Sequence, residues 1–275
     1  MVLPFAFLLL SLAAMNIIVC IKQVPDTTAV RIDPETRTLV REGVPSIVNP
    51  FDMYAIEEGI RLREKHGGTV TALTMGPPQA DAALREAISL GVDEAVHLCD
   101  VAFKGSDTLA TSYALAAGIR KIATFDLIIC GKQASDGDTA QVGPGIAVQL
   151  DLPQVVFVRT IVEIREGRLT TERITEEGFD LVETPLPAVV TVVKEINEPR
   201  MPSLKGKMKA RKAEIRTWGV QELGVDPGRV GLDGSPTWVE KVFSPPQRAA
   251  GQVWHGESAE LVKKLVGELE KVKLI

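Results

Sequence analysis

The chain has 275 residues, 31 of them basic and 36 acidic, which gives a formal net charge of −5. This mild acidity argues against a nucleic-acid partner, because such a protein needs a basic surface to neutralise phosphates. The hydrophobic content of 45% with only 5% aromatic residues is typical of an α/β core built from aliphatic side chains. The length allows one large domain, or one domain with an extension.

Residues 1–14 form an apolar N-terminal extension. Together with residues 15–21 they approach the ~20 residues that span a bilayer, so a membrane anchor is one interpretation. A signal peptide would begin with positive charge, yet no Lys or Arg precedes Lys22. Residues 16–24 (NIIVCIKQV) instead have the pattern of a core strand. We therefore expect Met15 to be the functional start, and we expect no membrane association.

Apolar runs typical of strands alternate with helical patterns from residue 15 to residue 193. The helix over 80–90 is expected to end at Gly91, and Asp107 is expected to open the next helix. This alternation predicts a parallel sheet that is covered on both faces by helices. The predicted strands span 16–24, 69–74, 94–98, 126–130, 155–162 and 188–193, and the predicted helices span 50–65, 80–90, 108–123 and 142–150.

A hairpin signal interrupts this alternation. Glu166-Gly167 separates two strand-like runs, 158–165 and 168–174, before the apolar run 188–193 returns as a buried strand. The mostly parallel sheet is therefore expected to carry an antiparallel addition at one edge.

Residues 194–275 lose the α/β pattern. Six prolines interrupt the segment, residues 205–216 are strongly basic, and only residues 258–271 regain a helical pattern. Apolar side chains such as Trp218, Trp238 and Val242 are too frequent for a solvated linker. Exposed apolar segments of this kind usually mark a partner surface. We expect residues 15–193 to form the α/β domain and residues 194–275 to form an arm that packs on a partner.

The three cysteines, Cys20, Cys99 and Cys130, are far apart in sequence, and no C-x-x-C pair is present. Neither a zinc site nor a disulfide framework is therefore indicated. Cys20 and Cys130 lie in the apolar runs IIVCI and LIICG, so we expect both to be small buried side chains. A reducing cytoplasm is the expected compartment.

The most informative segment is 131–144, GKQASDGDTAQVGP, which follows a predicted buried strand and leads into a helix. A Gly-rich loop that enters a helix offers unpaired backbone N–H groups and the positive end of the helix dipole to a phosphate. The loop matches neither the P-loop nor the dinucleotide fingerprint. Asp136 and Asp138 are expected to cap the helix or to hold a ribose hydroxyl. The alternative is a loop whose Asp and Gly residues serve only turn and cap geometry.

Three further segments should lie near this loop. They are the end of the first strand (Cys20, Lys22), the cluster 49–52 (NPFD) before a helix, and Met75 after the second strand. In an open parallel sheet, ligands bind outside the carboxyl ends of the strands, so these segments predict one nucleotide pocket. We identify no nucleophile, acid–base pair or metal-ligand cluster, and therefore expect no catalytic side chain of the protein's own. A redox cofactor would bring its own chemistry.

Several motifs in register resemble the beta subunit of electron transfer flavoproteins. They are 19–25 (VCIKQVP), 49–52 with the following helix, 131–144, 197–212 (NEPRMPSLKGKMKARK) and 231–239 (GLDGSPTWV). The resemblance implies a sheet of the adenine-nucleotide-binding (Rossmann-like) type, with a C-terminal arm that embraces an alpha subunit in a heterodimer.

The resemblance also implies site residues. Carried over by matching position, the nucleotide contacts would be Cys20, Asn49, Pro50, Phe51, Asp52, Met75, Gly131, Lys132, Gln133, Ala134, Ser135, Asp136, Gly137, Asp138, Thr139, Ala140, Gln141 and Val142. A recognition loop would dock onto a partner dehydrogenase of the acyl-CoA dehydrogenase type, with Leu204 as its anchoring leucine and the basic side chains steering the encounter. Its residues would be Asn197, Glu198, Pro199, Arg200, Leu204, Lys205, Lys207, Met208 and Lys209. For this basic run, a solvated surface is the alternative interpretation.

Two groups within this family differ in the nucleotide that the beta subunit holds. Simple electron carriers hold a structural AMP, whereas electron-bifurcating members hold a second FAD that NADH reduces. Residues 136–144 read DGDTAQVGP, which is similar to the bifurcating group, and the small Gly137 and Ala140 would let a flavin diphosphate approach the backbone. The sequence thus favours FAD, with NADH as donor and with ferredoxin or flavodoxin as the low-potential acceptor. Rival interpretations are the AMP-holding carrier, a stress-protein-like regulatory module, and an adenylating enzyme of the same sheet class.

Overall fold

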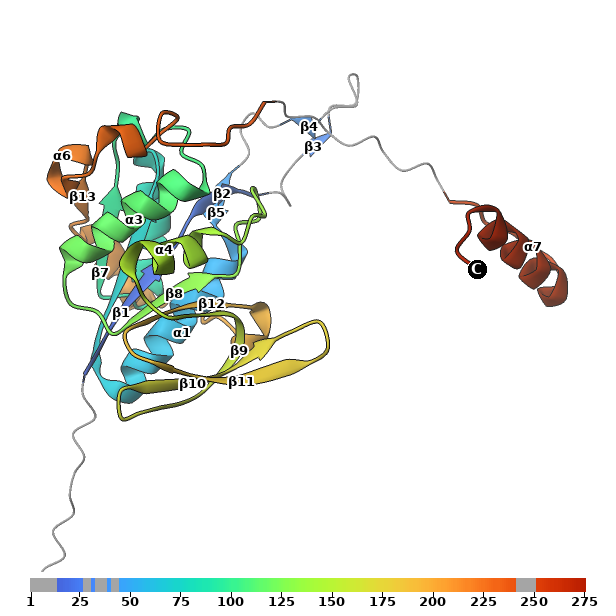
Figure 1. The fold of residues 1–275 in the computed structure, drawn as a ribbon, viewed down its shortest axis with the longest axis horizontal. Coiled ribbons are helices and arrows are strands. Elements are labelled where there is room, and N and C mark those ends of the chain that lie inside the picture. Colours follow the sequence, from blue (N-terminus) through green and yellow to red (C-terminus); the bar gives the residue numbers. More distant parts are fainter. Residues whose placement is uncertain (1–13, 27–30, 33–38, 41–44, 241–250) are drawn as a thin grey trace, which may run out of the picture. The chain divides into compact units, whose positions relative to one another are not determined.

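The computed structural model describes residues 14–26, 31–32, 39–40, 45–240 and 251–275. Its main feature is a nine-stranded sheet in the order β11-β10-β9-β12-β8-β1-β6-β7-β13 (Figure 1). All strands from β9 to β13 in this order run parallel, whereas β10 and β11 continue the sheet beyond β9 as an antiparallel meander. The predicted mostly parallel α/β sheet with an antiparallel edge is therefore confirmed. The strands of this sheet are β1 (Met15–Cys20), β6 (Gly68–Met75), β7 (Glu94–Leu98), β8 (Leu127–Gly131), β9 (Gln154–Arg165), β10 (Arg168–Ile174), β11 (Phe179–Pro185), β12 (Ala188–Val192) and β13 (Arg216–Trp218).

The helices begin and end close to the predicted positions. Asp107 opens α3 as expected, because its carboxylate accepts hydrogen bonds from the N–H groups of Leu109 and Ala110 at 2.9 and 3.0 Å. Gly91 ends α2 at a φ of 132°, which glycine adopts without strain. The helices are α1 (Pro50–His66), α2 (Asp81–Leu90), α3 (Thr108–Ile122), α4 (Val142–Leu150), α5 (Leu204–Lys212), α6 (Val220–Leu223) and α7 (Ser258–Lys271), and the 3₁₀ helices are η2 (Pro78–Ala80), η3 (Val101–Phe103), η4 (Lys194–Ile196) and η5 (Pro227–Arg229).

The alternation of side chains along β1 divides the core into two layers. Ile17 and Val19 pack in one apolar cluster with α1 and α2, whereas Ile18 and Cys20 pack in the other with α3 and α4. Successive side chains of a strand point to opposite faces, so a strand buried on both faces is apolar throughout. The central strands are consequently inaccessible except at their ends.

The first predicted strand is wrong in its extent. β1 ends at Cys20, and the chain enters a separate strand, β2 (Gln23–Pro25), which pairs antiparallel with β5 (Ser46–Val48). Another two-stranded ribbon joins β3 (Arg31–Ile32) to β4 (Leu39–Val40). Because β1 ends at Cys20, residues 21 and 22 connect β1 to β2 at the carboxyl end of the sheet.

The expectation that only residues 258–271 regain a helical pattern after residue 194 is wrong. α5 forms within the basic segment and packs on α2, and β13 adds a ninth strand beside β7. Neither element has the apolar periodicity that predicts a helix or strand from sequence, because most of their side chains are exposed and their neighbours hold them in place. The predicted domain boundary after Val193 stays a prediction.

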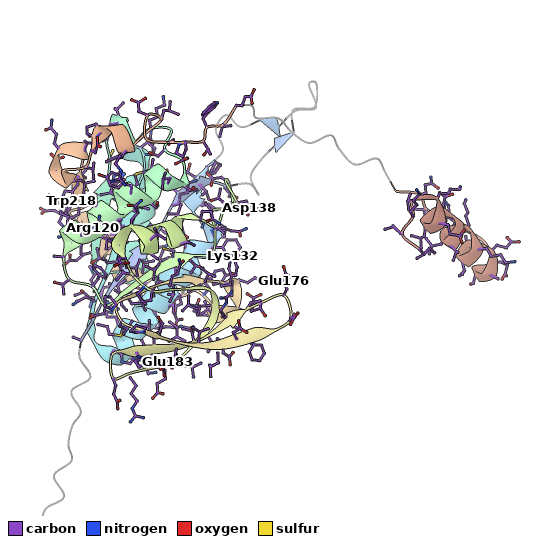
Figure 2. The ribbon with its side chains drawn as sticks, in the orientation of Figure 1. Arg120, Lys132, Asp138, Glu176, Glu183 and Trp218 are labelled. Atoms are coloured by element: carbon purple, nitrogen blue, oxygen red, sulfur yellow. The ribbon has the colours of Figure 1, made fainter. Side chains whose placement is uncertain are left out.

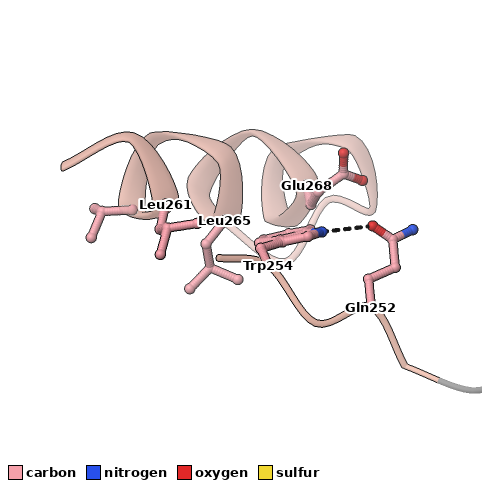
Figure 3. Close-up of a pocket in the computed structure, with 6 residues that line it drawn as sticks. Gln252, Trp254, Leu261, Leu265 and Glu268 are labelled. Carbon is pink, nitrogen blue, oxygen red and sulfur yellow. Dashed lines mark hydrogen bonds between the residues drawn. The ribbon is translucent and has the colours of Figure 1, made fainter. Parts of the chain in front are cut away.

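The chain forms two compact units, which meet between Glu240 and Lys241 in sequence. In the second unit, α7 carries Leu261, Val262 and Leu265 on one side, and the Trp254 indole packs there (Figure 3). The Trp254 Nε1 donates a hydrogen bond to Gln252 at 3.0 Å. Val262 and Leu265 remain 59% and 50% exposed, so this helix presents an apolar surface.

Among the described residues, no helix is long and apolar enough to cross a membrane. The apolar segment 1–13, on which the membrane-anchor interpretation depends, lies outside the described residues.

Candidate functional site

The candidate site lies at the carboxyl ends of β1 and β8. These strands are adjacent and parallel, with Cys20 directly opposite Cys130. The strands that come next in the chain are added on opposite sides of this pair. After β1, the strands β6 and β7 lie beyond β1, whereas after β8 the strand β12 lies beyond β8. Such a reversal of strand order opens a crevice in which α/β sheets bind ligands. The sheet topology thus places the reversal point of the strand order directly above the two cysteines.

Asp52 ties together three segments at this crevice. Its Oδ2 accepts a hydrogen bond from the backbone N–H of Lys22 at 2.7 Å, and its carboxyl group also accepts from the N–H of Gly131. The side chain is buried in the first turn of α1. Burial raises the pKa of Asp52 to about 7, although the hydrogen bonds that it accepts oppose that rise. A carboxyl that titrates near neutral pH therefore lies directly under the loop after β8.

Asp52→Asn is expected to flatten the pH dependence of unfolding. A carboxyl whose pKa is raised on folding stabilises the fold fully below its usual value of 3.8, and this contribution is lost as pH rises through about 7. The loss is on the order of 4 kcal/mol at roughly 1.4 kcal/mol per pKa unit. Urea unfolding of the nucleotide-free chain across this pH range measures it. The exposed Asp180→Asn on β11 is the control, and an unchanged slope in Asp52→Asn would contradict the assignment.

Asn49 holds the loop after β8 through its side chain. Its Nδ2 donates to the carbonyl oxygen of Gln133 at 2.8 Å, and its Oδ1 accepts from the N–H of Ser135 at 3.0 Å. Asn49 is also the N-cap residue of α1, yet its side chain makes no capping hydrogen bond to that helix. An asparagine at this position normally stabilises its own helix. Here the side-chain amide instead holds the backbone of the loop after β8, and it does so in place of capping α1.

The acidic residues of the loop do not cap α4, so the first of their two expected roles is wrong, and the second, a contact with a ribose hydroxyl, stays a prediction. Asp136 forms an ion pair with the Lys22 ammonium group at 2.7 Å, and Asp138 accepts a hydrogen bond from the Gln133 side chain. The N-cap of α4 is Gln141, whose side chain makes no capping hydrogen bond. The N-terminal turn of α4 thus keeps backbone N–H groups available for an anion.

The remaining predicted nucleotide contacts border the same crevice. Met75 ends β6, next to β1, while Pro50 and Phe51 begin α1. In the loop, Asp138 and Ala140 adopt left-handed φ values of 53° and 54°. The structure therefore brings together Cys20, residues 49–52, Met75 and the loop 131–142, while their contacts with a nucleotide stay a prediction. In Figure 2, Lys132 and Asp138 of this loop lie on the same side of the domain.

The two cysteines at the base of the crevice are free thiols. A hydrogen bond with Cys20 and burial raise the pKa of the Cys130 thiol well above its usual range. The expectation that Cys20 and Cys130 are buried is confirmed. Within the described part of the chain, no cluster of three or more potential ligand side chains is placed to hold a metal ion.

The predicted docking residues lie on a segment that α1 anchors. The Asn197 Nδ2 donates to the Tyr54 carbonyl oxygen and to Glu58, both at 3.0 Å. Arg200 pairs with Glu57 and Glu64, each at 2.7 Å. Beyond this anchor, Met201, Leu204 and Met208 are 86%, 77% and 55% exposed, so three apolar side chains project from a basic surface. Glu198, Pro199, Lys205 and Lys207 lie along the same segment, and the Lys209 Nζ donates to the Val92 carbonyl oxygen at 3.0 Å.

Sequence reasoning missed the residues that hold this segment. Glu57 and Glu64 lie about two turns apart on α1 and resemble an ordinary solvated face in sequence. Arg85 of α2 donates to the carbonyl oxygens of Ala210 and Ala213 at 2.7 and 3.2 Å, which satisfies the end of α5. Only the spacing of Glu57 and Glu64 on one helical face could have suggested a shared partner.

Comparisons with known proteins agree with this geometry. The model of the electron transfer flavoprotein domain matches residues 36–223. The chain is 52% identical to an electron transfer flavoprotein subunit beta of Thermoanaerobacterium thermosaccharolyticum, over 95% of this chain and 100% of the relative. It is 47% identical to the subunit beta of Megasphaera elsdenii, over 87% and 91% of the two chains. It is 46% identical to the caffeyl-CoA reductase-Etf complex subunit CarD of Acetobacterium woodii, over 95% and 100%. With its sheet, its crevice and its anchored basic segment, the chain belongs to the electron transfer flavoprotein family, among the beta subunits.

Proposed function

We propose that this beta subunit binds FAD in the crevice between β1 and β8 and receives electrons from NADH. It passes them to the FAD of an alpha subunit and to ferredoxin or flavodoxin. The observation that carries the proposal is the loop 131–142, which Asn49 and Asp52 hold open above the crevice. The bound flavin supplies the redox chemistry, and the protein supplies binding and orientation.

The loop backbone fits a diphosphate. A Cβ placed on Gly137 would meet nothing within 4 Å, so the loop presents its peptide groups to open space at this point. Phosphate groups bind well to such exposed N–H groups beside a helix N-terminus. The polar side chains of Thr139 and Gln141 would offer further contacts near the diphosphate or the ring of the bound nucleotide. These features support FAD, while a crevice of this kind also accommodates AMP, which is the alternative.

Partner binding follows from the exposed apolar surfaces. An alpha subunit is the proposed partner of the C-terminal arm, because α7 exposes Val262 and Leu265. The segment 197–209 is proposed to dock a dehydrogenase of the acyl-CoA dehydrogenase type. The name of CarD places that relative in a caffeyl-CoA reductase-Etf complex.

The test is the nucleotide content of the chain co-expressed with its alpha subunit, released by denaturation and quantified. Two FAD per heterodimer, with bleaching of the flavin absorbance by NADH, is the expected result. One FAD with one AMP, and no response to NADH, would make this subunit a holder of structural AMP and would overturn the proposal of bifurcation.

Leu204→Ala is expected to slow electron transfer to the dehydrogenase by about tenfold or more, because a single buried anchor dominates many interfaces. In the free chain the Leu204 side chain is 77% exposed, so the substitution should change the free energy of unfolding by less than about 0.5 kcal/mol. Steady-state transfer assays with the purified dehydrogenase measure the first effect, and thermal unfolding measures the second. The control is Val101→Ala, which removes a side chain that is 87% exposed and lies outside the segment 197–209. Equal rates for the two variants would rule out the anchoring role.

A further inference from the structure

Two exposed methionines lie in the segment 197–209. Met201 and Met208 are 86% and 55% exposed, whereas the other methionines that the structure describes are buried or half-buried. Methionine is a flexible apolar side chain that usually fills a core or an apolar contact. Two exposed methionines so close in sequence therefore present their thioether sulfur atoms to small solutes in water.

Met208 lies on the side of α5 that faces away from α2. Gly206 and Ala210 are four residues apart and share the side that packs on α2, because Ala210 is buried and a Cβ on Gly206 would lie 2.0 Å from the Ser89 carbonyl oxygen. Leu204 and Met208 form a second such pair, offset by two residues, which corresponds to about 200° of rotation around a helix. Leu204 and Met208 therefore share the outer side of α5.

Other side chains supply the polar contacts that hold this segment among the described residues. The Ser203 hydroxyl caps α5 by accepting a hydrogen bond from the Gly206 N–H at 3.0 Å, and Arg85 satisfies carbonyl oxygens at the other end. Before α5, Asn197 and Arg200 attach the chain to α1. A change confined to the thioethers would therefore alter the surface of the segment and leave its backbone in place.

Oxidation by a peroxide is such a change. A lone pair of the thioether sulfur attacks one oxygen of hydrogen peroxide, the O–O bond breaks, an S–O bond forms, and the remainder of the peroxide leaves as water. Sulfur loses two electrons and the peroxide gains them, so no further reactant is required. The product, methionine sulfoxide, is polar, and a reductase returns it to the thioether with electrons from a pair of thiols.

We propose that Met201 and Met208 are a reversible modification site, at which a peroxide weakens docking through the segment 197–209. A sulfoxide oxygen must lose its water when a partner covers Leu204 and its surroundings, and a buried polar group without a hydrogen bond opposes binding. Electron delivery to the dehydrogenase thus falls when peroxide accumulates and returns after reduction. This inference rests on the proposed docking role of the segment and names its regulation.

The test uses the co-expressed heterodimer, treated with hydrogen peroxide that catalase removes before the dehydrogenase is added. Peptide mass spectrometry locates the sulfoxides, and the rate of electron transfer is measured at a heterodimer concentration below saturation. The unmodified protein is compared with a double variant, Met201→Leu with Met208→Leu, which stays apolar but has no sulfur there. The matched control is Met53→Leu, which replaces a half-buried methionine of α1. Each rate is divided by the rate of the same protein before treatment.

We expect sulfoxide at Met201 and Met208, with a rate about tenfold lower in the unmodified and Met53→Leu proteins and nearly constant in the double variant. Methionine sulfoxide reductases A and B with dithiothreitol should restore the rate of the unmodified protein. An unchanged rate despite both sulfoxides, no sulfoxide at either position, or an equal loss in the double variant would each overturn the inference. A loss of bound flavin or a lower Tm after oxidation would also overturn it, since unfolding would then explain the slower transfer.

Leu204→Ala separates this inference from the docking role on which it rests. If Leu204→Ala slows electron transfer and oxidation does not, the segment docks the dehydrogenase but is not regulated through its methionines. If neither change slows transfer, the docking role itself is wrong, and the inference fails with it.

Discussion

Gly131→Ala is expected to destabilise the domain by about 3 kcal/mol and to release the nucleotide from the heterodimer. A Cβ at this position would lie 2.3 Å from Asp52 Oδ1, 2.7 Å from the Phe51 carbonyl carbon and 2.8 Å from the Asp52 nitrogen. Two of these atoms belong to the backbone of the first turn of α1, which cannot move without shifting the helix. The loop 131–142 must therefore move away, and it would lose the hydrogen bond from the Gly131 N–H to Asp52.

Urea unfolding and quantified nucleotide release measure the two effects of Gly131→Ala. The matched control for stability is Gly137→Ala in the same loop, because its Cβ would meet nothing within 4 Å. This control should unfold within about 0.5 kcal/mol of the unmodified chain. If Gly131→Ala matched Gly137→Ala in stability, the close contact between β8 and α1 would not be essential.

Arg200→Ala is expected to lower the free energy of unfolding by about 3 kcal/mol at neutral pH, because it leaves a buried carboxylate short of a partner. The Arg200 Nε donates to Glu57 at 2.7 Å, and its Nη1 donates to Glu64 at 2.7 Å. The Glu57 side chain is only 4% exposed and would retain only Arg61 as a charged partner. The segment 197–209 would also lose its main attachment to α1. Because we propose that this segment docks the dehydrogenase, the rate of electron transfer to the dehydrogenase should also fall.

The pH dependence gives Arg200→Ala a specific signature. Burial by itself raises the pKa of Glu57, but the hydrogen bonds from Arg200 and Arg61 outweigh it, so the pKa is lowered from its usual value of 4.5. A carboxylate with a lowered pKa stabilises the fold above its usual value, and the contribution is lost as pH falls through the folded pKa. The difference between the variant and the unmodified chain should therefore be largest at neutral pH and should shrink below about pH 4.

Chemical unfolding at several pH values measures this signature. The control is Arg168→Ala, because Arg168 and Glu183 are 51% and 57% exposed and their pair should contribute less than about 1 kcal/mol. A destabilisation by Arg200→Ala that is as large well below pH 4 as at pH 7 would show that lost packing, and not the ion pair, is responsible.

The elements that sequence predicts well are those whose own residues carry the pattern. Residues 127–130 of the predicted strand 126–130 are wholly apolar because they are buried on both faces, and the predicted helix 142–150 coincides with α4. The site loop 131–144 was also evident, since its glycines and its place between a strand and a helix are local properties. The family resemblance depended on the same local motifs.

The elements that sequence predicts poorly are stabilised from outside. α5 (LKGKMKARK) has too few apolar residues to indicate a buried face, yet Gly206 packs so closely that a Cβ would lie 2.0 Å from the Ser89 carbonyl oxygen of α2. β13 is three residues long and depends on pairing with β7. The capping roles expected of Asp136 and Asp138 were wrong because Lys22 and Gln133, which are their partners, come from other turns of the chain.

The sequence by itself determined the α/β class, the antiparallel edge, the position of the loop 131–144 between a strand and a helix, and the family, because periodicity and motif residues are local. Only the tertiary structure decided that Asp52 is buried beneath Gly131 and that Glu57 and Glu64 share Arg200. Each of these pairings joins residues far apart in the chain. Their distance and burial depend on how strands and helices pack, which no single segment encodes.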